Sequence, residues 1–191
     1  MGSTLKVDNL QNSDGTRTLA SDSGTAWSWG ANAPSGMILN LESTTKTDVF
    51  NTTSTTFTLV TGLTVSITPS YTSSKIFISA VVNVGTDDAN FAYVSLRRGT
   101  STDIFVGNSS GTKVQVSAMF YSGDNEGRIS AIPVMHLDSP STTSATTYGI
   151  YLRCATAGNA CVNKSYRDSD SSGYDMRTAR SITAMEIVVK G

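Results

Sequence analysis

Residues 57–84 constrain the fold more than any other stretch, because two strand patterns occur there in succession. In the first pattern, Leu63, Val65 and Ile67 alternate with hydroxyl-bearing residues, which is the period of a half-buried strand. Pro69 and the serines that follow it break the alternation, since proline cannot donate to a strand ladder and serine favours turns. We therefore expect two consecutive strands joined by a turn.

The second pattern is apolar on both faces of the predicted strand. One face carries only aliphatic side chains, at Ile76, Ile78, Ala80, Val82 and Val84. The opposite face carries Phe77 and Val81. A strand with two apolar faces has to be covered on both, so we expect a central strand packed against a second sheet. We further expect another subunit to cover Phe77 and Val81, with a hydrophobic ligand groove as the alternative.

The composition favours strands joined by polar turns over helices. Of the 191 residues, 38% are hydrophobic and only 15% are charged, while Ser, Thr, Gly and Asn are abundant. The net charge of −1 offers no basic surface for nucleic acid. No apolar run approaches the roughly 20 residues of a membrane span, and no signal peptide is recognisable. We therefore expect neither nucleic-acid binding nor membrane insertion.

Further apolar runs continue along the rest of the chain, without helical periodicity of any length. They occupy residues 37–41, 49–50, 57–60, 91–98, 103–106, 114–121, 128–137, 148–154 and 181–189. Pro133 marks an edge position or a bulge. We expect an all-β chain whose residues 36–191 form an antiparallel β-sandwich of about eight strands, a jelly roll. The rival immunoglobulin-like sandwich would need a Cys…Trp…Cys pattern that this chain lacks.

Residues 1–35 differ in character from the rest of the chain. Small apolar clusters alternate there with turn signals such as Asp14-Gly15. Their members are Leu5, Val7, Leu10, Trp27 and Trp29. These side chains are too few and too scattered to build a core alone. We therefore expect this short extended segment to pack on the main domain, on copies of itself or on a partner, and we regard all five residues as candidates for an oligomer interface.

The order of several sequence blocks resembles that of a known family. The start STLKVDNLQ, the run TTKTDVFNTTSTTFTLVTGLTVSITPSYTSSKIFI, and the blocks HLDSPSTTSATTYGIYLR and VNKSYRDSDSSGYDMRTARSITAMEIV resemble tail-fibre-like virion structural proteins of tailed phages, especially marine and cyanobacterial ones. The resemblance covers most of the chain, and the order of the blocks is more specific than any single block. This chain departs from longer relatives in having almost no shaft.

The resemblance implies a jelly-roll head on an N-terminal virion-attachment segment, usually as a homotrimer. It implies a place on the virion surface after assembly in the host cytoplasm, with other virion proteins bound through residues 1–35. Because the shaft is almost missing, the expected form is a short tail fibre or knob that contacts the host cell surface. A capsid decoration or head-fibre protein without a receptor role is the alternative.

Residue constellations that could support catalysis are weak. Residues 107–111, GNSSG, match the GxSxG nucleophile pattern, but the following residues predict a strand and not the required helix. His136, the one histidine, lies within another predicted strand, where a surface or interface position is expected. Nothing in the sequence brings two loop carboxylates together, as a glycosidase would need. We expect no enzyme activity and no cofactor.

One segment resembles the first half of a calcium-binding loop. Asp168, Asp170 and Ser172 place oxygen atoms at alternating positions before Gly173. The twelfth position of such a loop is Ala179, so the bidentate acidic ligand is missing. We expect a solvated turn here, with calcium as the lesser alternative.

Cys154 and Cys161 flank a predicted hairpin tip. A two-residue turn at Ala157-Gly158 would place the two cysteines opposite each other, within reach of a disulfide. Because nothing in the sequence indicates an oxidising compartment, two free thiols are the expected state.

Loop aromatic residues are the best candidates for ligand contact. Tyr121, Tyr166 and Tyr174 lie at strand ends or in loops beside Gly, Asn and Asp residues, and Asn125 follows in the loop after Tyr121. Tyrosine rings stack on sugar rings, while Asn and Asp hydrogen-bond to hydroxyl groups. These four residues are our candidates for contact with a host surface glycan, although an ordinary role as amphipathic loop residues is the favoured interpretation.

Overall fold

The computed structural model describes residues 9–11, 18–22, 26–28, 33–170, 173 and 175–189, with side chains described from residue 33 onward. Near the N-terminus, β1 (Asn9–Gln11), β2 (Thr18–Asp22) and β3 (Ala26–Ser28) form a small antiparallel sheet. Gln11 pairs with Thr18, while the turn predicted at Asp14-Gly15 lies outside the described residues. Of the interface candidates, Leu10 lies on β1 and Trp27 on β3, whereas Leu5, Val7 and Trp29 lie outside the described residues.

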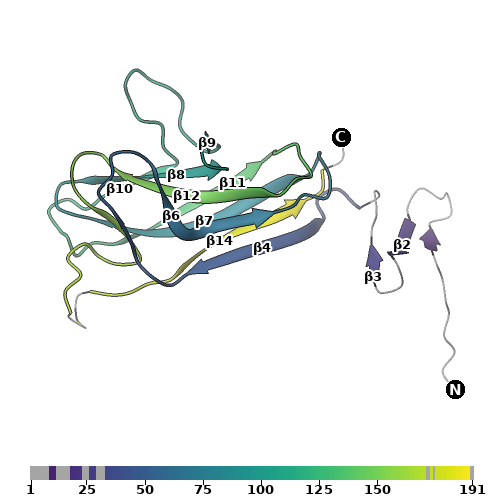
Figure 1. Ribbon diagram of the computed structural model, residues 1–191, viewed down its shortest axis with the longest axis horizontal. Helices are drawn as coiled ribbons and strands as arrows, with labels where there is room; N and C mark the ends of the chain where they lie inside the picture. The colour runs from purple at the N-terminus through teal and green to yellow at the C-terminus, as the bar shows by residue number, and fades with distance from the viewer. Residues whose placement is uncertain are drawn as a thin grey trace.

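Two larger antiparallel sheets form a β-sandwich, which confirms the predicted fold class (Figure 1). The first sheet contains β4 (Ile38–Lys46), β14 (Arg180–Ile187), β7 (Lys75–Thr86), β11 (Ser130–Asp138), β13 (Ala160–Val162) and β5 (Phe50–Thr52). The second sheet contains β6 (Thr58–Ile67), β12 (Thr146–Cys154), β8 (Phe91–Arg98), β10 (Ala118–Tyr121) and β9 (Thr102–Asp103). Every described element of this part of the chain is therefore a strand or a connection between strands.

Strand β7 is the central strand that its sequence predicts. One edge of β7 pairs with β11, and the other edge pairs first with β14 and then with β13. Its even-numbered apolar side chains, from Ile76 to Val84, are buried in the core, while Phe77 and Val81 are half-buried on the outer face. Pro133 lies on β11, which pairs only with β7 among the described strands, so the predicted edge position is confirmed.

The eight long strands pair in a nested order along the chain. The first, β4, pairs with the last, β14. The second, β6, pairs with the seventh, β12, and the third, β7, pairs with the sixth, β11. The fourth and fifth strands, β8 and β10, pair with each other. As a result each sheet mixes strands from both halves of the chain, so the core can form only when the whole sandwich closes.

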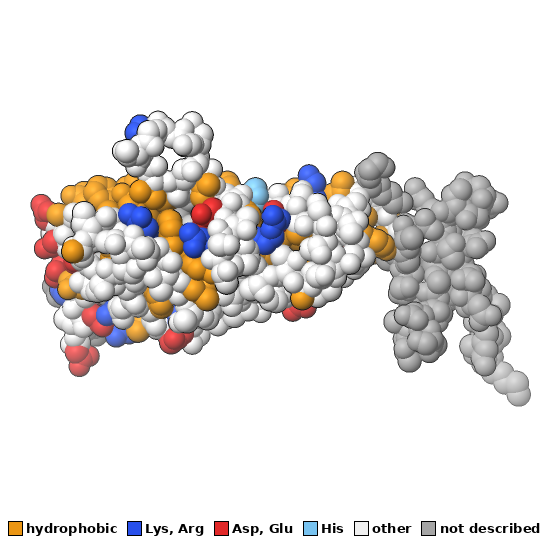
Figure 2. Space-filling model, turned by 45° about the horizontal axis from the view of Figure 1, so that its top comes forward, with side chains coloured by type: hydrophobic (Ala, Val, Ile, Leu, Met, Phe, Trp, Pro, Cys, Tyr) orange, Lys and Arg blue, Asp and Glu red, His pale blue; other side chains and the backbone are white. Residues whose placement is uncertain are grey.

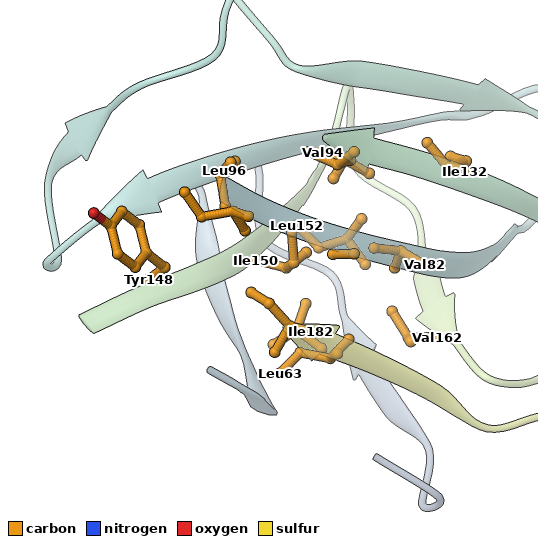
Figure 3. Close-up of a cluster of buried hydrophobic side chains, with 14 of the residues drawn as sticks. Leu63, Val82, Val94, Leu96, Ile132, Tyr148, Ile150, Leu152, Val162 and Ile182 are labelled. Atoms are coloured by element: carbon orange, nitrogen blue, oxygen red, sulfur yellow. The ribbon is translucent and has the colours of Figure 1, made fainter. Parts of the chain in front are cut away.

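The core lies between the two sheets and draws on both. Leu63, Val94 and Ile150 come from the second sheet, and Val82 and Ile182 come from the first (Figure 3). All five side chains are fully buried. Alternation of side chains along each strand places these residues inward, because successive residues of a strand point to opposite faces.

Two segments differ from the prediction. Strand β6 joins two predicted strands into one, because a bulge at Gly62, with φ of 83°, lets the chain continue past the interruption. Conversely, the predicted strand 114–121 is wrong at its start, since only Ala118–Tyr121 forms β10. The Ser117 hydroxyl accepts the backbone N–H of Leu96 across 2.9 Å, and this side-chain contact replaces the next ladder bond. The predicted strand 103–106 is wrong as well, because β9 (Thr102–Asp103) overlaps it only at Asp103.

The two ends of the sandwich chain meet at one end of the molecule. The Gly36 N–H donates to the Val188 carbonyl across 2.7 Å, and the Val188 N–H donates to the Met37 carbonyl across 2.9 Å. Strand β7 runs from this end, where Lys75 pairs with Ile187, toward the opposite end. The loops at that opposite end, which we call the distal loops, are residues 87–90, 122–129, 155–159 and 163–170.

Candidate functional site

A row of apolar side chains crosses four neighbouring strands on the outer face of the first sheet. Leu41 pairs with Met185, Met185 with Phe77, and Phe77 with Leu137. We call these four residues the apolar row. Leu41 is 54% exposed and Leu137 is 44% exposed, and Met135 extends the surface along β11. Side chains of this size in one contiguous exposed patch mark an interaction surface more often than a solvated one.

Val81 lies on the same face, beside a shallow pocket. The pocket has a volume of about 220 Å³ and is lined by Thr45, Val81, Ala179, Arg180 and Ser181. Arg180 donates from Nη2 to Oδ1 of Asn83 across 2.7 Å, while its Nε is buried and meets no acceptor among the described residues. A buried donor without an acceptor costs free energy. This face therefore offers a second molecule apolar area beside the pocket.

The outer face of the second sheet carries a different surface, which begins at the distal loops. Tyr121 at the end of β10 stacks on Phe91, with ring centroids 4.5 Å apart. Phe91 in turn lies 6.4 Å from Tyr93, the next outward residue of β8. Tyr121 is 44% exposed, and Phe91 and Tyr93 are half-buried. The three rings form a line from Tyr121 through Phe91 to Tyr93.

Two arginines continue this line away from the distal loops. Arg153 lies over the ring of Tyr93 at 5.3 Å and over the ring of Phe57 at 5.8 Å. Arg97 lies over Phe57 at 5.0 Å and over Tyr151 at 4.7 Å. Such cation–π contacts fix both guanidinium groups against the sheet. Figure 2 shows hydrophobic and basic side chains side by side along one face of the sandwich.

We call this surface the aromatic–arginine stripe. Its members are Tyr121, Phe91, Tyr93, Arg153, Phe57, Arg97 and Tyr151. The register of the sheet assembles it, because Tyr93 pairs with Arg153 and both side chains point outward. Of these seven residues, only Tyr121 is a candidate from sequence reasoning. The alternation of FAYVSLRR, which places Phe91, Tyr93 and Arg97 on one face, is the signal that could have found the others.

The two arginines differ in their charge partners. Arg97 donates from Nε to Oδ1 of Asp103 across 2.8 Å, and Ser95 also donates to that oxygen. Arg153 donates from Nε to the carbonyl of Cys154 across 3.2 Å. Among the described residues, none of the ion pairs includes Arg153. The positive charge of Arg153 is therefore the one on the stripe that no carboxylate compensates.

The distal loops are tied into one unit by hydrogen bonds to Asp87. Its Oδ1 accepts from Asn90 Nδ2 across 3.0 Å, and its Oδ2 accepts the backbone N–H of Asn159 across 2.9 Å. Its backbone carbonyl accepts the Ser122 hydroxyl across 2.8 Å. Gly158 makes this packing possible, because a Cβ there would lie only 1.9 Å from Asn90 Nδ2. The loops therefore present a preorganised surface.

The predicted contact residues all fall at this distal end, as far as the structure describes them. Tyr121 is exposed, as predicted for a contact residue. Asn125 is exposed, but its Oδ1 accepts the Gly127 N–H across 3.0 Å and shapes its own loop. Tyr166 is half-buried, and its hydroxyl accepts from Asn159 Nδ2 across 3.3 Å. Tyr174 lies outside the described residues.

The proposed calcium oxygens have other partners in the structure. Asp168 pairs with Lys164 across 2.9 Å and also with Arg177. Hydrogen bonds from these two cations hold the pKa of the Asp168 carboxyl below its ordinary value, and the bond from Arg177 has the larger effect. Asp170 is exposed, and Ser172 lies outside the described residues. Two cations on the leading carboxylate favour the solvated-turn interpretation over a calcium loop.

A second carboxylate holds the neighbouring loop. Asp175 accepts from Arg167 Nε across 3.0 Å and from the Ser165 hydroxyl across 2.5 Å, and Ser169 donates to it as well. The Arg167 guanidinium, followed by the two serine hydroxyls, holds the pKa of Asp175 well below its usual range. This carboxyl stays ionised at any physiological pH, so the loop conformation does not depend on its titration.

The groups considered for catalysis lie apart. His136 stacks on Phe105, with ring centroids 5.3 Å apart, at the open edge beside β11. Ser109, the serine of the GNSSG pattern, lies in an exposed loop that leads to no helix. Within the described ranges, no group of three or more His, Cys, Asp or Glu residues is placed to hold a metal ion. No helix in those ranges is long and apolar enough to cross a membrane.

The two cysteines are free and lie in different sheets. Cys154 ends β12 in the second sheet, and Cys161 lies on β13 in the first. The two-residue turn that would place them opposite each other does not form, because the chain crosses from one sheet to the other between them. Burial raises the pKa of each thiol to about 11.

Comparison with protein-family models and with curated proteins finds no match to this chain.

Proposed function

We propose that this chain is a virion surface structural protein of a tailed phage, a short trimeric tail fibre or knob that contacts the host cell surface. It would assemble in the host cytoplasm and act without catalysis or a cofactor. Three kinds of support bear on this proposal: the resemblance of its sequence blocks, the pairing of its strands, and the surfaces on the two outer faces of the sandwich.

The pairing of the strands supports a jelly-roll head. In a jelly roll the first strand pairs with the eighth, the second with the seventh, the third with the sixth and the fourth with the fifth. The pairs β4–β14, β6–β12, β7–β11 and β8–β10 follow this scheme. We infer that the sandwich is a jelly roll with β5, β9 and β13 as short additions at its edges.

The apolar row supports self-association. Leu41 and Leu137 expose about half of their surface in the isolated chain, and Phe77 lies between them. A second copy of the same chain would cover this face. The N-terminal sheet of each copy would meet its counterparts and form a small shared core.

The observation that carries the proposal is that the N-terminal segment and the distal loops lie at opposite ends of the sandwich. The chain from the N-terminal segment enters at the end where Gly36 bonds to Val188. The distal loops and Tyr121 lie at the other end, where β7 pairs with β13. A knob tethered at one end and presenting contact groups at the other has this arrangement. Three weak sites on one trimer would gain by effective concentration, so no single site needs high affinity.

Removal of residues 3–35 tests the attachment role. The truncated chain should remain soluble and folded, because the main hydrophobic cluster of the sandwich lies within residues 50–184. It should not appear in purified virions assembled in its presence, whereas the full chain should. Thermal unfolding of the truncated head serves as the folding control. Incorporation of the truncated chain at the level of the full chain would contradict the proposed attachment segment.

A capsid decoration or head-fibre protein without a receptor is the second candidate. The observation that favours it is that the distal loops use their polar groups internally. Tyr166 accepts a hydrogen bond from Asn159 of another distal loop, and Asn125 accepts one from Gly127 of its own loop. A surface whose polar groups are already satisfied offers a receptor less than a surface with free groups. The location of the protein on the virion, by labelling of the capsid or of the tail, separates the two candidates.

A further inference from the structure

We infer that the aromatic–arginine stripe binds an anionic polysaccharide, with Arg153 pairing with the acidic group of the polymer. This inference deepens the proposed host contact and rests on it for its biological meaning. It concerns the outer face of the second sheet, where Tyr121 at the end of β10 lies beside the distal loops. The argument starts from the environment of Arg153.

Arg153 is held in place on one side and open on the other. The rings of Tyr93 and Phe57 lie against its guanidinium at 5.3 and 5.8 Å. Its Nε is used by the carbonyl of Cys154. The terminal nitrogens have no carboxylate partner in the part of the chain that the structure describes, and the side chain is half-exposed. A guanidinium held against two aromatic rings loses little entropy when it pairs with an anion.

Arg97, on the same surface, differs from Arg153 in having a carboxylate partner. Arg97 also lies over two rings, those of Phe57 and Tyr151, but its Nε donates to Asp103 across 2.8 Å. The stripe thus supplies a carboxylate for one arginine and none for the other. A ligand carboxylate or phosphate placed at Arg153 would complete the pattern with a charge-assisted, bidentate contact.

The neighbouring rings specify the rest of the ligand. Tyr93, Phe91 and Tyr121 form a line of stacked aromatic side chains next to Arg153. Aromatic faces pack against the C–H faces of sugar rings, and a line of them suits several rings of one polymer. A ligand that offers sugar rings at intervals and an acidic group on some of them is an anionic polysaccharide. Its acid can be a uronate carboxylate or a phosphate, since both fit the guanidinium fork.

Calorimetric titration of the full-length protein tests this inference with three polymers. Polygalacturonate carries carboxylates, phosphomannan carries phosphates, and dextran is neutral. We expect binding to at least one anionic polymer, weaker at about 500 mM salt than at about 50 mM because screening acts on the exposed pair. The polymer that binds identifies the acid. Binding to neither anionic polymer, or equal binding to dextran, would overturn the inference.

Variants locate the contact. Arg153→Gln should weaken binding about tenfold or more, because a charge-assisted contact is lost. Lys113→Gln removes the same charge from the exposed loop before β10 and should change affinity less than about twofold. Tyr93→Leu keeps the charge, removes a ring and should also weaken binding. Unchanged affinity in both stripe variants would contradict the assignment. A fall in the solution mass of Arg153→Gln would instead identify the stripe as a contact between subunits.

This test is independent of the proposed place on the virion. Polysaccharide binding is measured on the isolated protein, whereas attachment is measured by incorporation into particles. Loss of incorporation together with intact polysaccharide binding, or the reverse, would therefore show which of the two proposals fails.

Discussion

The hydroxyl of Ser74 donates to the buried carboxylate of Glu186 across 2.7 Å, which joins the loop before β7 to the last strand of the sandwich. Ser70 adds its backbone N–H at 2.6 Å and its hydroxyl at 3.0 Å. Glu186 is fully buried and takes part in no ion pair among the described residues. Its three neutral donors close the end of the core where the N-terminal segment enters.

Replacement of Glu186 should destabilise the sandwich strongly. Glu186→Ala leaves the buried hydroxyl of Ser74 without an acceptor and removes both contacts to Ser70, at a cost of about 2–4 kcal/mol in the free energy of unfolding. Glu42→Ala, an exposed change on β4, should cost less than about 0.5 kcal/mol. Urea unfolding of both variants measures the difference. Equal stability of the two variants would show that the Glu186 contacts do not anchor this end.

A methyl group at Gly158 should disturb the distal loops. Gly158→Ala would place its Cβ against Asn90 and within 2.8 Å of Asp87 Oδ2. Asn90 then has to leave Asp87, and we expect a loss of about 1–3 kcal/mol in stability. Gly107→Ala is the matched control, because its Cβ would meet nothing within 4 Å. The melting temperatures of the two variants measure the difference. If Gly158→Ala melts at the same temperature as Gly107→Ala, the Asp87 hydrogen bonds do not contribute to stability.

The buried thiols should resist modification in the native state. Burial raises the pKa of Cys154 and Cys161 to about 11, from an ordinary value of 9.0. At pH 8 the reactive thiolate is then about a hundredfold scarcer than in the unfolded chain, before steric exclusion is counted. Labelling with a thiol reagent, in buffer and in denaturant, measures this ratio. Rapid labelling of both cysteines in buffer would contradict their burial.

The same shift has a consequence for stability at high pH. Between pH 9 and 11 the unfolded chain loses thiol protons that the native chain keeps. The unfolded state therefore binds fewer protons in this window, and the free energy of unfolding should fall as the pH rises through it. The double variant Cys154→Ser, Cys161→Ser should lack this part of the decline, even though its overall stability is lower.

If the distal end contacts the host, substitution of Tyr121 should reduce adsorption to host cells while substitution of a ring elsewhere should not. Tyr121→Ala removes the exposed ring that stacks on Phe91, and adsorption to host cells should fall severalfold. Phe105→Ala removes an exposed ring beside β11, away from the distal loops, and should leave adsorption unchanged. Virions carrying each variant are compared in an adsorption assay. Equal adsorption by the two variants would contradict host contact through Tyr121 and support the capsid decoration protein.

Much of the fold could be predicted from local patterns. The alternation in residues 75–84 identified both the central strand and its two apolar faces, because burial of one face forces period-two spacing. Strand β8 was predicted with its observed bounds for the same reason. Residues 114–117 have the same alternation but form no strand, since a serine hydroxyl replaced the ladder contact there. A sequence pattern cannot distinguish these two outcomes.

The candidate site was less accessible to sequence reasoning. Tyr121 could be identified as an exposed loop-end aromatic residue, but Arg153 and Phe57 meet only through the pairing of β12 with β6 and β8. Their contact depends on which strands become neighbours, and that information is spread over the whole chain. Likewise, the cysteines looked like partners across a hairpin, whereas the crossing between sheets separated them.

The subunit contact can be tested by a charge placed in the apolar row. Leu137→Lys puts an ammonium group opposite Phe77, where a second copy would have to bury it, so the assembly should dissociate. Val114→Lys is the control, because Val114 is 43% exposed in a loop and Leu137 is 44% exposed in the row. The control should keep the mass of the unmodified protein. Dissociation of both variants, or of neither, would place the subunit contact elsewhere.

The solution mass of the unmodified protein tests the central claim most directly. Light scattering on a size-exclusion column should give about 60 kDa, the mass of three 20.1 kDa chains. That value is expected if the apolar row is covered by copies of the same chain. A stable monomer of 20.1 kDa, unchanged at the highest concentration reached, would contradict the trimeric knob and leave the apolar row as the site of a different partner.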